Sequence, residues 1–172
     1  HASLGRAAAA GSYGRFQGTV SAGTSERSGI SSMVGASVMD LDGPDLYFPE
    51  FHAKGGDGWI RGLDGDRYRR FFASVYSGPL SVRSVFASRD KTVPTAPWNT
   101  IAGDRATVST DQVGFVDAII ERPVRRDLGI LGRAYVHSAL YRGGWPWIPE
   151  DSTGAQERRV DLERDEGLSL GV

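Results

Sequence analysis

The chain has 172 residues, of which 40% are hydrophobic and 24% are charged, and its formal net charge is -1. This balance gives no argument for a nucleic-acid partner. The absence of cysteine excludes disulfides, thiolate nucleophiles and cysteine metal sites. No run of about 18 apolar residues exists, which excludes a transmembrane helix but not a transmembrane β-strand, since such a strand needs only about 9–11 alternating residues.

The first residues indicate little about function. The chain begins at His1 and carries no signal-peptide pattern, so we expect a processed product or a cut piece. An N-terminal histidine can also form half of a copper brace, with His52 or His137 as the second imidazole. The favoured interpretation is that His1 is simply where the fragment begins.

Alternation of apolar and polar residues predicts strands in the first part of the chain. Residues 2–12 are small and weakly patterned, and Gly11-Ser12-Tyr13-Gly14 predicts a tight connection. Strands are expected over residues 15–22 and 30–39, with a short turn at 26–29 between them.

A hairpin over residues 67–91 is the template for the rest of the sheet. Phe71, Ala73 and Val75 share one face of its first strand, and polar residues such as Arg70 lie on the other. Ser77-Gly78-Pro79 then reverses the chain, and the alternation continues after it.

The later strands alternate with long irregular segments. Strands are predicted over residues 111–121, 128–141 and, in part, 160–172, with a short turn at Arg122–Arg126. Segments without a sustained period cover residues 40–66, 90–110 and 142–159. Prolines, including the Trp145-Pro146-Trp147 run, favour loops in the last two segments.

The order of the connections predicts the fold class. Short turns alternate with long loops along the chain, so the short turns gather at one end of the sheet and the long loops at the other. This asymmetry is typical of outer-membrane β-barrels. We therefore expect an all-β, antiparallel up-and-down meander of about 7–8 strands that forms a partial transmembrane β-barrel, with residues 1–172 as one domain. A wet or plugged lumen accommodates inward charges on Arg70, Arg83, Arg133 and His137.

Aromatic residues near the strand ends are consistent with girdles at the two membrane interfaces. The alternative is that they only pack strand ends and loops. The residues concerned are Tyr13, Tyr47, Phe48, Tyr68, Tyr76, Tyr135, Tyr141, Trp145 and Trp147.

Several runs make the chain resemble a known family. They are Asp40-Leu41-Asp42-Gly43-Pro44-Asp45-Leu46-Tyr47-Phe48-Pro49-Glu50-Phe51, Gly62 to Phe72, Ser88 to Ala96, Gly114-Phe115-Val116-Asp117 and Arg164-Asp165-Glu166-Gly167. Together they resemble the early barrel strands and loops of TonB-dependent outer-membrane receptors. The resemblance extends from about Ala2 to the end of the chain.

The resemblance implies a location in the bacterial outer membrane and a barrel of about 22 strands with a plugged lumen. It implies uptake of a scarce small-molecule ligand such as a siderophore or another metal chelate, or cobalamin. The implied partners are outer-membrane lipid and a TonB-type energising protein, which acts through a plug that we expect to lie outside this chain, as do the closing strands. No cofactor, metal or nucleic acid is implied.

Loop aromatics are the candidate ligand-binding residues. In such a barrel the long loops face outward, so these side chains would ring the mouth, with Arg61, Arg67 and Lys91 available to an anionic chelate. The alternative is that the aromatics pack the loops on one another. The candidates are Tyr47, Phe48, Trp59, Arg61, Trp98, Trp145 and Trp147.

Other functions find weaker support. Ser88-Arg89-Asp90-Lys91 has the serine–lysine spacing of penicillin-binding enzymes, but it ends a strand where that chemistry needs a helix start. The aspartate clusters 40–45 and 57–66 lack the spacing of a calcium loop. We therefore expect no enzyme; the alternative to a receptor segment is a soluble secreted β-domain that binds a glycan or protein through its long loops.

Overall fold

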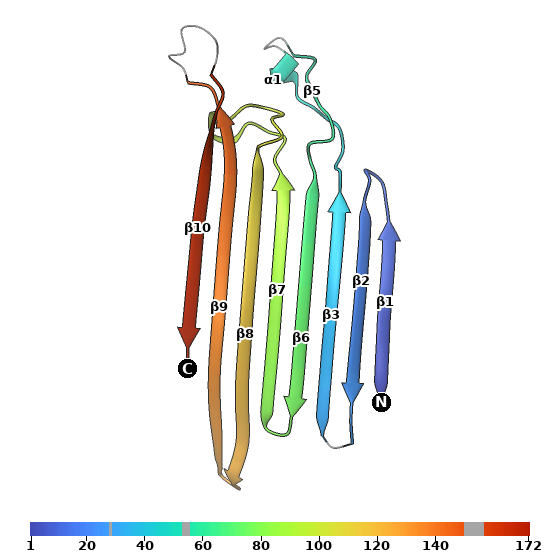
Figure 1. Ribbon diagram of the computed structural model, residues 1–172, viewed down its shortest axis with the longest axis vertical. Helices are drawn as coiled ribbons and strands as arrows, with labels where there is room; N and C mark the ends of the chain where they lie inside the picture. Colours follow the sequence, from blue (N-terminus) through green and yellow to red (C-terminus); the bar gives the residue numbers. More distant parts are fainter. Residues whose placement is uncertain (28, 53–55, 150–156) are drawn as a thin grey trace.

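The computed structural model describes residues 1–27, 29–52, 56–149 and 157–172. It is an all-β protein, with 69% of residues in strands and 4% in helices. Eight strands form one antiparallel up-and-down sheet in the order β1-β2-β3-β6-β7-β8-β9-β10 (Figure 1). The predicted meander, in which each strand pairs with its neighbour in the chain, is confirmed.

Figure 1 shows the short turns at one end of the sheet and the long loops at the other. The first loop, residues 42–65, carries the small β4–β5 sheet and helix α1, and the second loop, residues 93–107, carries the 3-10 turn η1. No helix within the described ranges is long and apolar enough to cross a membrane. The elements are β1 (Ala2–Ala10), β2 (Phe16–Ser25), β3 (Ile30–Leu41), β4 (Leu46–Tyr47), α1 (Pro49–His52), β5 (Trp59–Ile60), β6 (Asp66–Ser77), β7 (Leu80–Thr92), η1 (Pro97–Asn99), β8 (Val108–Arg125), β9 (Leu128–Trp147) and β10 (Arg159–Gly171).

The central hairpin forms as predicted. Strands β6 and β7 pair from Asp66 with Lys91 to Ser77 with Leu80, which leaves Gly78-Pro79 as a two-residue turn. Gly78 has φ 54°, a left-handed conformation that costs glycine little and that two-residue hairpin turns require.

Several strand boundaries differ from the sequence prediction. Residues 2–10, which show almost no alternation, form β1 because their backbone pairs with β2 along its whole length. The short turn predicted at Arg122–Arg126 lies later, at Arg126-Asp127, since β8 continues to Arg125 and β9 begins at Leu128. Pro123 is tolerated there because the register shifts between Pro123 and Arg125, as at a β-bulge.

The predicted irregular segment from Arg142 is also wrong in its first part. Strand β9 runs on to Trp147, because β10 pairs with it as far as Trp147 opposite Arg159. The pairing of β9 with β8 ends at Gly144, so Pro146 lies beyond that ladder and its missing N–H breaks no pair with β8. Most of the remaining segment, residues 150–156, lies outside the described residues.

The register divides the sheet into two unlike faces, because residues paired across antiparallel strands point to the same side. The apolar face is the side that carries Phe71, and the polar face is the side that carries Arg70. One row of paired residues across the apolar face is Leu4, Ala22, Val34, Ala73, Ser84, Val116, Val136 and Leu170. One row across the polar face is Gln17, Met39, Tyr68, Arg89, Asp111, Tyr141 and Asp165.

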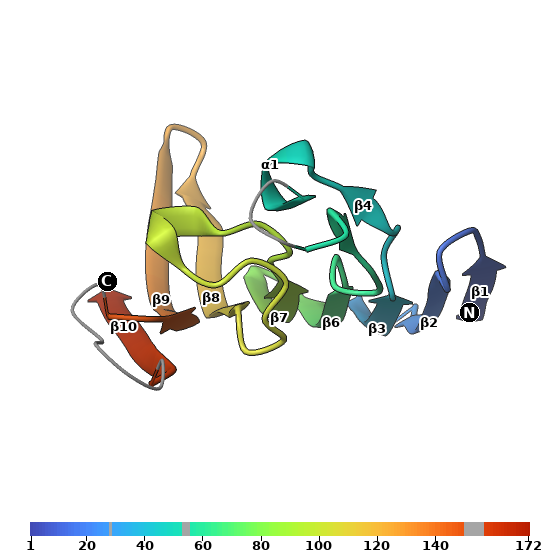
Figure 2. The same cartoon turned by 90° about the horizontal axis from the view of Figure 1, so that it is seen from above.

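No second layer of the described chain covers the apolar face. Seen from above, the eight strands stand in a single row, and the loops with α1 and β4 lie to one side of it (Figure 2). Phe71, Phe86 and Val116 are 46%, 47% and 46% exposed. The accessible surface is 12163 Å², against about 8200 Å² for a compact soluble monomer of 18.5 kDa.

The aromatic girdle expected from the sequence is wrong for four of its residues. The register places Tyr68, Tyr76, Tyr135 and Tyr141 on the polar face. A girdle at a lipid interface requires side chains on the apolar side. These tyrosines instead cover the polar side of the sheet near its ends.

Close packing on the polar face predicts different responses at two glycines. A Cβ on Gly35 would lie 2.3 Å from the ring of Phe72 on the paired strand, whereas a Cβ on Gly167 would meet nothing within 4 Å. We expect Gly35→Ala to lower the free energy of unfolding by about 1–3 kcal/mol, since the ring must move. Urea unfolding of the refolded protein measures the change.

The matched control is Gly167→Ala on the same face, which we expect to change that free energy by no more than about 0.5 kcal/mol. Equal losses in both variants would contradict the role assigned to the Phe72 ring.

Candidate functional site

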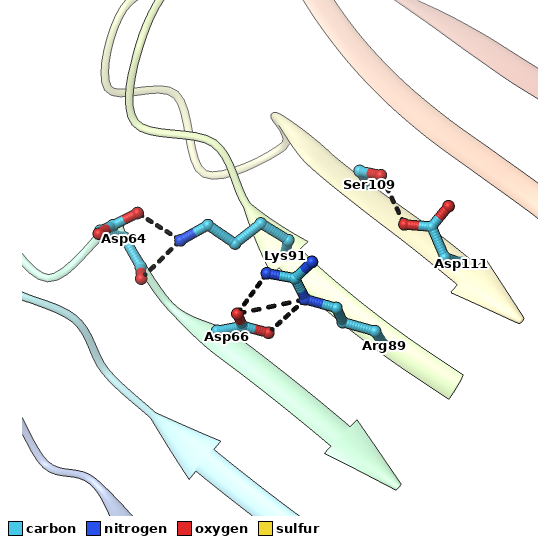
Figure 3. A network of polar contacts seen from close by, with 6 residues as sticks. All are labelled: Asp64, Asp66, Arg89, Lys91, Ser109 and Asp111. Atoms are coloured by element: carbon cyan, nitrogen blue, oxygen red, sulfur yellow. Dashed lines mark hydrogen bonds and ion pairs between the residues drawn. The ribbon is translucent and has the colours of Figure 1, made fainter. Parts of the chain in front are cut away.

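Charged side chains pair with one another where the polar face meets the loops. Arg89 holds Asp66 through both of its carboxylate oxygens, with a shortest distance of 2.6 Å. Lys91 donates from Nζ to the side chain of Asp64 in the first loop and, at 3.0 Å, to its carbonyl oxygen (Figure 3). These contacts tie the first loop to the ends of β6 and β7.

The three cations expected to attract an anionic chelate all have carboxylate partners. Arg61 pairs with Asp57 at 2.7 Å, and Arg67 pairs with Asp40 at 3.0 Å. Lys91 pairs with Asp64. Each positive charge is therefore neutralised locally, and the described residues give no free cationic cluster at these three positions.

Three of the four predicted binding residues of the first loop form one aromatic cluster, which we call the first aromatic cluster. The rings of Tyr47 and Trp59 are 5.2 Å apart, centroid to centroid, and the guanidinium of Arg61 lies 5.6 Å from the Trp59 ring. Phe48 packs separately against Phe51, also at 5.2 Å. Tyr47 and Trp59 are paired residues of the β4–β5 sheet, which explains their contact.

The other three predicted residues meet at a second place, which we call the tryptophan pocket. Trp98 comes from η1, whereas Trp145 and Trp147 come from the end of β9. The rings of Trp98 and Trp145 meet edge to face with centroids 4.6 Å apart. The pocket has a volume of about 1000 Å³ and is lined by Trp98, Asn99, Thr100, Trp145, Trp147, Ile148, Asp161 and Glu163.

A strained turn presents Trp98 to the pocket. Trp98 and Asn99 have φ values of 52° and 62°, in the left-handed region that bulky side chains rarely occupy. Thr100 holds the turn closed, because its amide and its hydroxyl both donate to the Pro97 carbonyl, at 3.0 and 2.7 Å. Trp98 is nevertheless 77% exposed, so this turn holds a large aromatic residue at the surface.

Two glycines of β9 leave room for the second loop and for the Trp145 indole, which lies back along its own strand. A Cβ on Gly143 would lie 2.4 Å from Nε1 of Trp145, and a Cβ on Gly144 would lie 2.6 Å from the Ala106 carbonyl oxygen. The amide of Ile101 also donates to the Pro146 carbonyl at 2.8 Å. Figure 2 shows the second loop, in yellow-green, crossing the ends of β7, β8 and β9.

An ion pair fixes the second loop to the start of β10. Arg158 donates to both carboxylate oxygens of Asp104, at 2.6 and 2.9 Å. This contact lowers the pKa of Asp104 below its ordinary value; burial opposes the shift and a hydrogen bond from the Ala106 amide reinforces it. The pair therefore holds the loop that carries Trp98 while the carboxylate is ionised.

The fold separates one of the two imidazole pairs considered for a metal site and places the serine–lysine pair on a strand; the side chain of the other candidate, His52, lies outside the described part of the chain. His1 precedes β1 and His137 lies on β9, six strand positions across the sheet, so the geometry does not bring these two imidazoles together. The described residues contain no group of three side chains placed to hold a metal ion. Ser88 and Lys91 both lie on β7 and not at a helix start.

Sequence reasoning missed the acidic side of the pocket. Asp161 and Glu163 of β10 reach it because they pair with Trp145 and Gly143 of β9, and Glu163 accepts a hydrogen bond from Trp145 Nε1 at 3.1 Å. The alternation of Asp161 and Glu163 with Val160 and Leu162 was the available signal. Without the register it did not indicate which aromatic residues they would face.

The depressed pKa of Asp104 predicts a loop that loosens in acid. A lowered carboxyl pKa contributes stability that is fully present above the ordinary value of 3.8 and is lost as pH falls through the folded value. A spin label at Arg105→Cys should therefore stay immobile from pH 7 to about 5 and gain mobility below about pH 4.

Asp104→Asn should make the same label mobile at pH 7 and remove most of its acid response. Asp57→Asn, which breaks an ion pair in the first loop, is the control and should preserve the wild-type curve. An unchanged curve in Asp104→Asn would show that the ion pair does not hold the loop.

No protein-family model, curated protein or solved structure matches this chain.

Proposed function

We propose that this chain is a segment of the β-barrel of a TonB-dependent outer-membrane receptor, which takes up a scarce small ligand. Its apolar face contacts outer-membrane lipid, its polar face lines the lumen, and its long loops face outside. Energy reaches the receptor from a TonB-type protein through a plug that is not part of residues 1–172. The observation that carries the proposal is an apolar face left exposed by a single-layered sheet.

The height of the apolar face supports contact with a bilayer. On β8 this face is apolar or small between Gln112 and Arg122, which stand ten residues apart. Ten residues span about 34 Å along a strand, and a tilt of 35–45° reduces this to about 24–28 Å across the membrane. The lipid-facing band of outer-membrane barrels is about 25 Å tall.

A polar border at the loop end of the apolar face also supports contact with a bilayer. One row of paired residues across the apolar face consists of Asp40, Arg67, Asp90, Thr110, Arg142 and Arg164. Arg67 pairs with Asp40, and the Thr110 hydroxyl donates to Asp90 at 2.7 Å. Such a row fits the polar headgroup region above a hydrocarbon core, where charged side chains remain solvated.

The proposal can be tested with single cysteines, since the chain has none of its own. An environment-sensitive fluorophore is attached in turn at Val34, Val116 and Val136 of the apolar face and at Ser37, Val113 and Ala139 of the polar face, after refolding into lipid vesicles. We expect blue-shifted emission, quenched by brominated lipid, at the first three sites only. The alternation follows because adjacent strand residues point to opposite sides.

Val113 and Ala139 control for local hydrophobicity, because they are apolar residues that the register assigns to the polar face. Quenching at all six sites, or a chain that stays in water as a monodisperse monomer with cooperative unfolding, would contradict the proposal and favour the soluble secreted β-domain.

A further inference from the structure

We infer that the tryptophan pocket binds a small organic cation, of the protonated-amine or quaternary-ammonium class. The inference names the ligand class of the loop-end site and rests on the proposed function, in which the loops meet the ligand first. It replaces the anionic chelate expected from the sequence. Three indole rings and two carboxylates around one cavity carry it.

The charged residues that line the pocket are both negative. They are Asp161 and Glu163, which stand two residues apart on the polar face of β10. The arginines close to them along the chain have partners of their own: Arg158 holds Asp104 at 2.6 Å and Arg164 pairs with Glu166 at 2.8 Å. Arg159 lies 3.5 Å from Glu157 and beside the Trp147 ring. An anion entering this cavity would be repelled by the two carboxylates, whereas a cation would be attracted.

The aromatic lining favours a cation over a neutral molecule. The faces of indole rings carry negative potential, and tryptophan is the strongest aromatic partner for a cation. The protein already uses one of these rings in this way, because the Arg159 guanidinium lies 5.8 Å from the centre of the Trp147 ring. Rings that surround a cation together with carboxylates are the known means of recognising quaternary ammonium groups.

The pocket is open to such a ligand. Trp98 is 77% exposed and held in a strained conformation, and it adds little to the packing of the sheet. Glu163 accepts hydrogen bonds from Trp145 Nε1 and from the Tyr141 hydroxyl. These bonds orient the carboxylate and leave further acceptor capacity, since an ionised carboxylate offers about four acceptor positions.

The test titrates the refolded full chain in a non-ionic detergent by calorimetry with three probes of nearly equal shape. These are choline, the neutral 3,3-dimethylbutan-1-ol and the anionic 3,3-dimethylbutanoate. We expect choline to bind, the neutral probe to bind about tenfold more weakly, and the anion to show no binding. The difference between the first two probes isolates the effect of charge.

Variants locate the binding. Asp161→Asn and Glu163→Gln should each lower the affinity for choline several-fold and leave the affinity for the neutral probe unchanged. Trp98→Ala should lower the affinity for both probes. Trp59→Ala and Asp57→Asn remove an equivalent ring and an equivalent carboxylate in the first aromatic cluster, and both should bind choline as the wild type does.

Equal affinity for choline and the neutral probe would overturn the inference, as would preference for the anion or the absence of binding at millimolar choline. The cysteine-labelling pattern separates these failures from a failure of the proposed function. If the labels alternate but choline does not bind, only the proposed ligand class is refuted. If the labels do not alternate, the proposal of a membrane segment is refuted, whether or not choline binds.

Discussion

The structure depends on backbone pairing within one layer of sheet. Each inner strand is hydrogen-bonded to a neighbour on both sides, so most buried backbone groups are satisfied without a second sheet or a layer of helices. Ile60 in the first loop is the one buried hydrophobic residue among those described. A soluble protein of this size would depend on an apolar interior, whereas this sheet presents its apolar residues outward.

The two faces keep most charges of the chain apart from its apolar residues. Arg133 pairs with Asp117 at 2.6 Å and Arg89 pairs with Asp66 on the polar face, so those charges never enter the apolar side. Most charges of the apolar face lie near the loop end, in and beside the row that begins with Asp40 and Arg67. Two exceptions are Arg122 near the turn end of β8 and Arg6 on the edge strand β1. The strict alternation of side chains makes this separation possible, since a slip of one residue would exchange the faces.

The loop-end site is a product of topology. Trp98 and Trp145 are far apart in sequence and meet because the second loop hydrogen-bonds to Pro146 and because Gly143 and Gly144 leave room for it. Asp161 joins them through its pairing with β9. The Asp104–Arg158 ion pair then connects the loop that presents Trp98 to the start of the strand that presents the carboxylates. This ion pair therefore links the aromatic side of the pocket to its acidic side.

The sequence by itself determined the strand meander, the central hairpin at Gly78 and the asymmetry between short turns and long loops, because period-two patterns and turn residues act locally. Tertiary structure decided the rest. Strand β1 has no pattern of its own and exists through β2, and β9 reaches Trp147 only because β10 pairs with it. Likewise, the loop aromatic residues can be identified from the sequence. Which strands lie side by side decides how these residues divide into two clusters and why one cluster is acidic. Pairing register is a long-range property, and local residue patterns do not encode it.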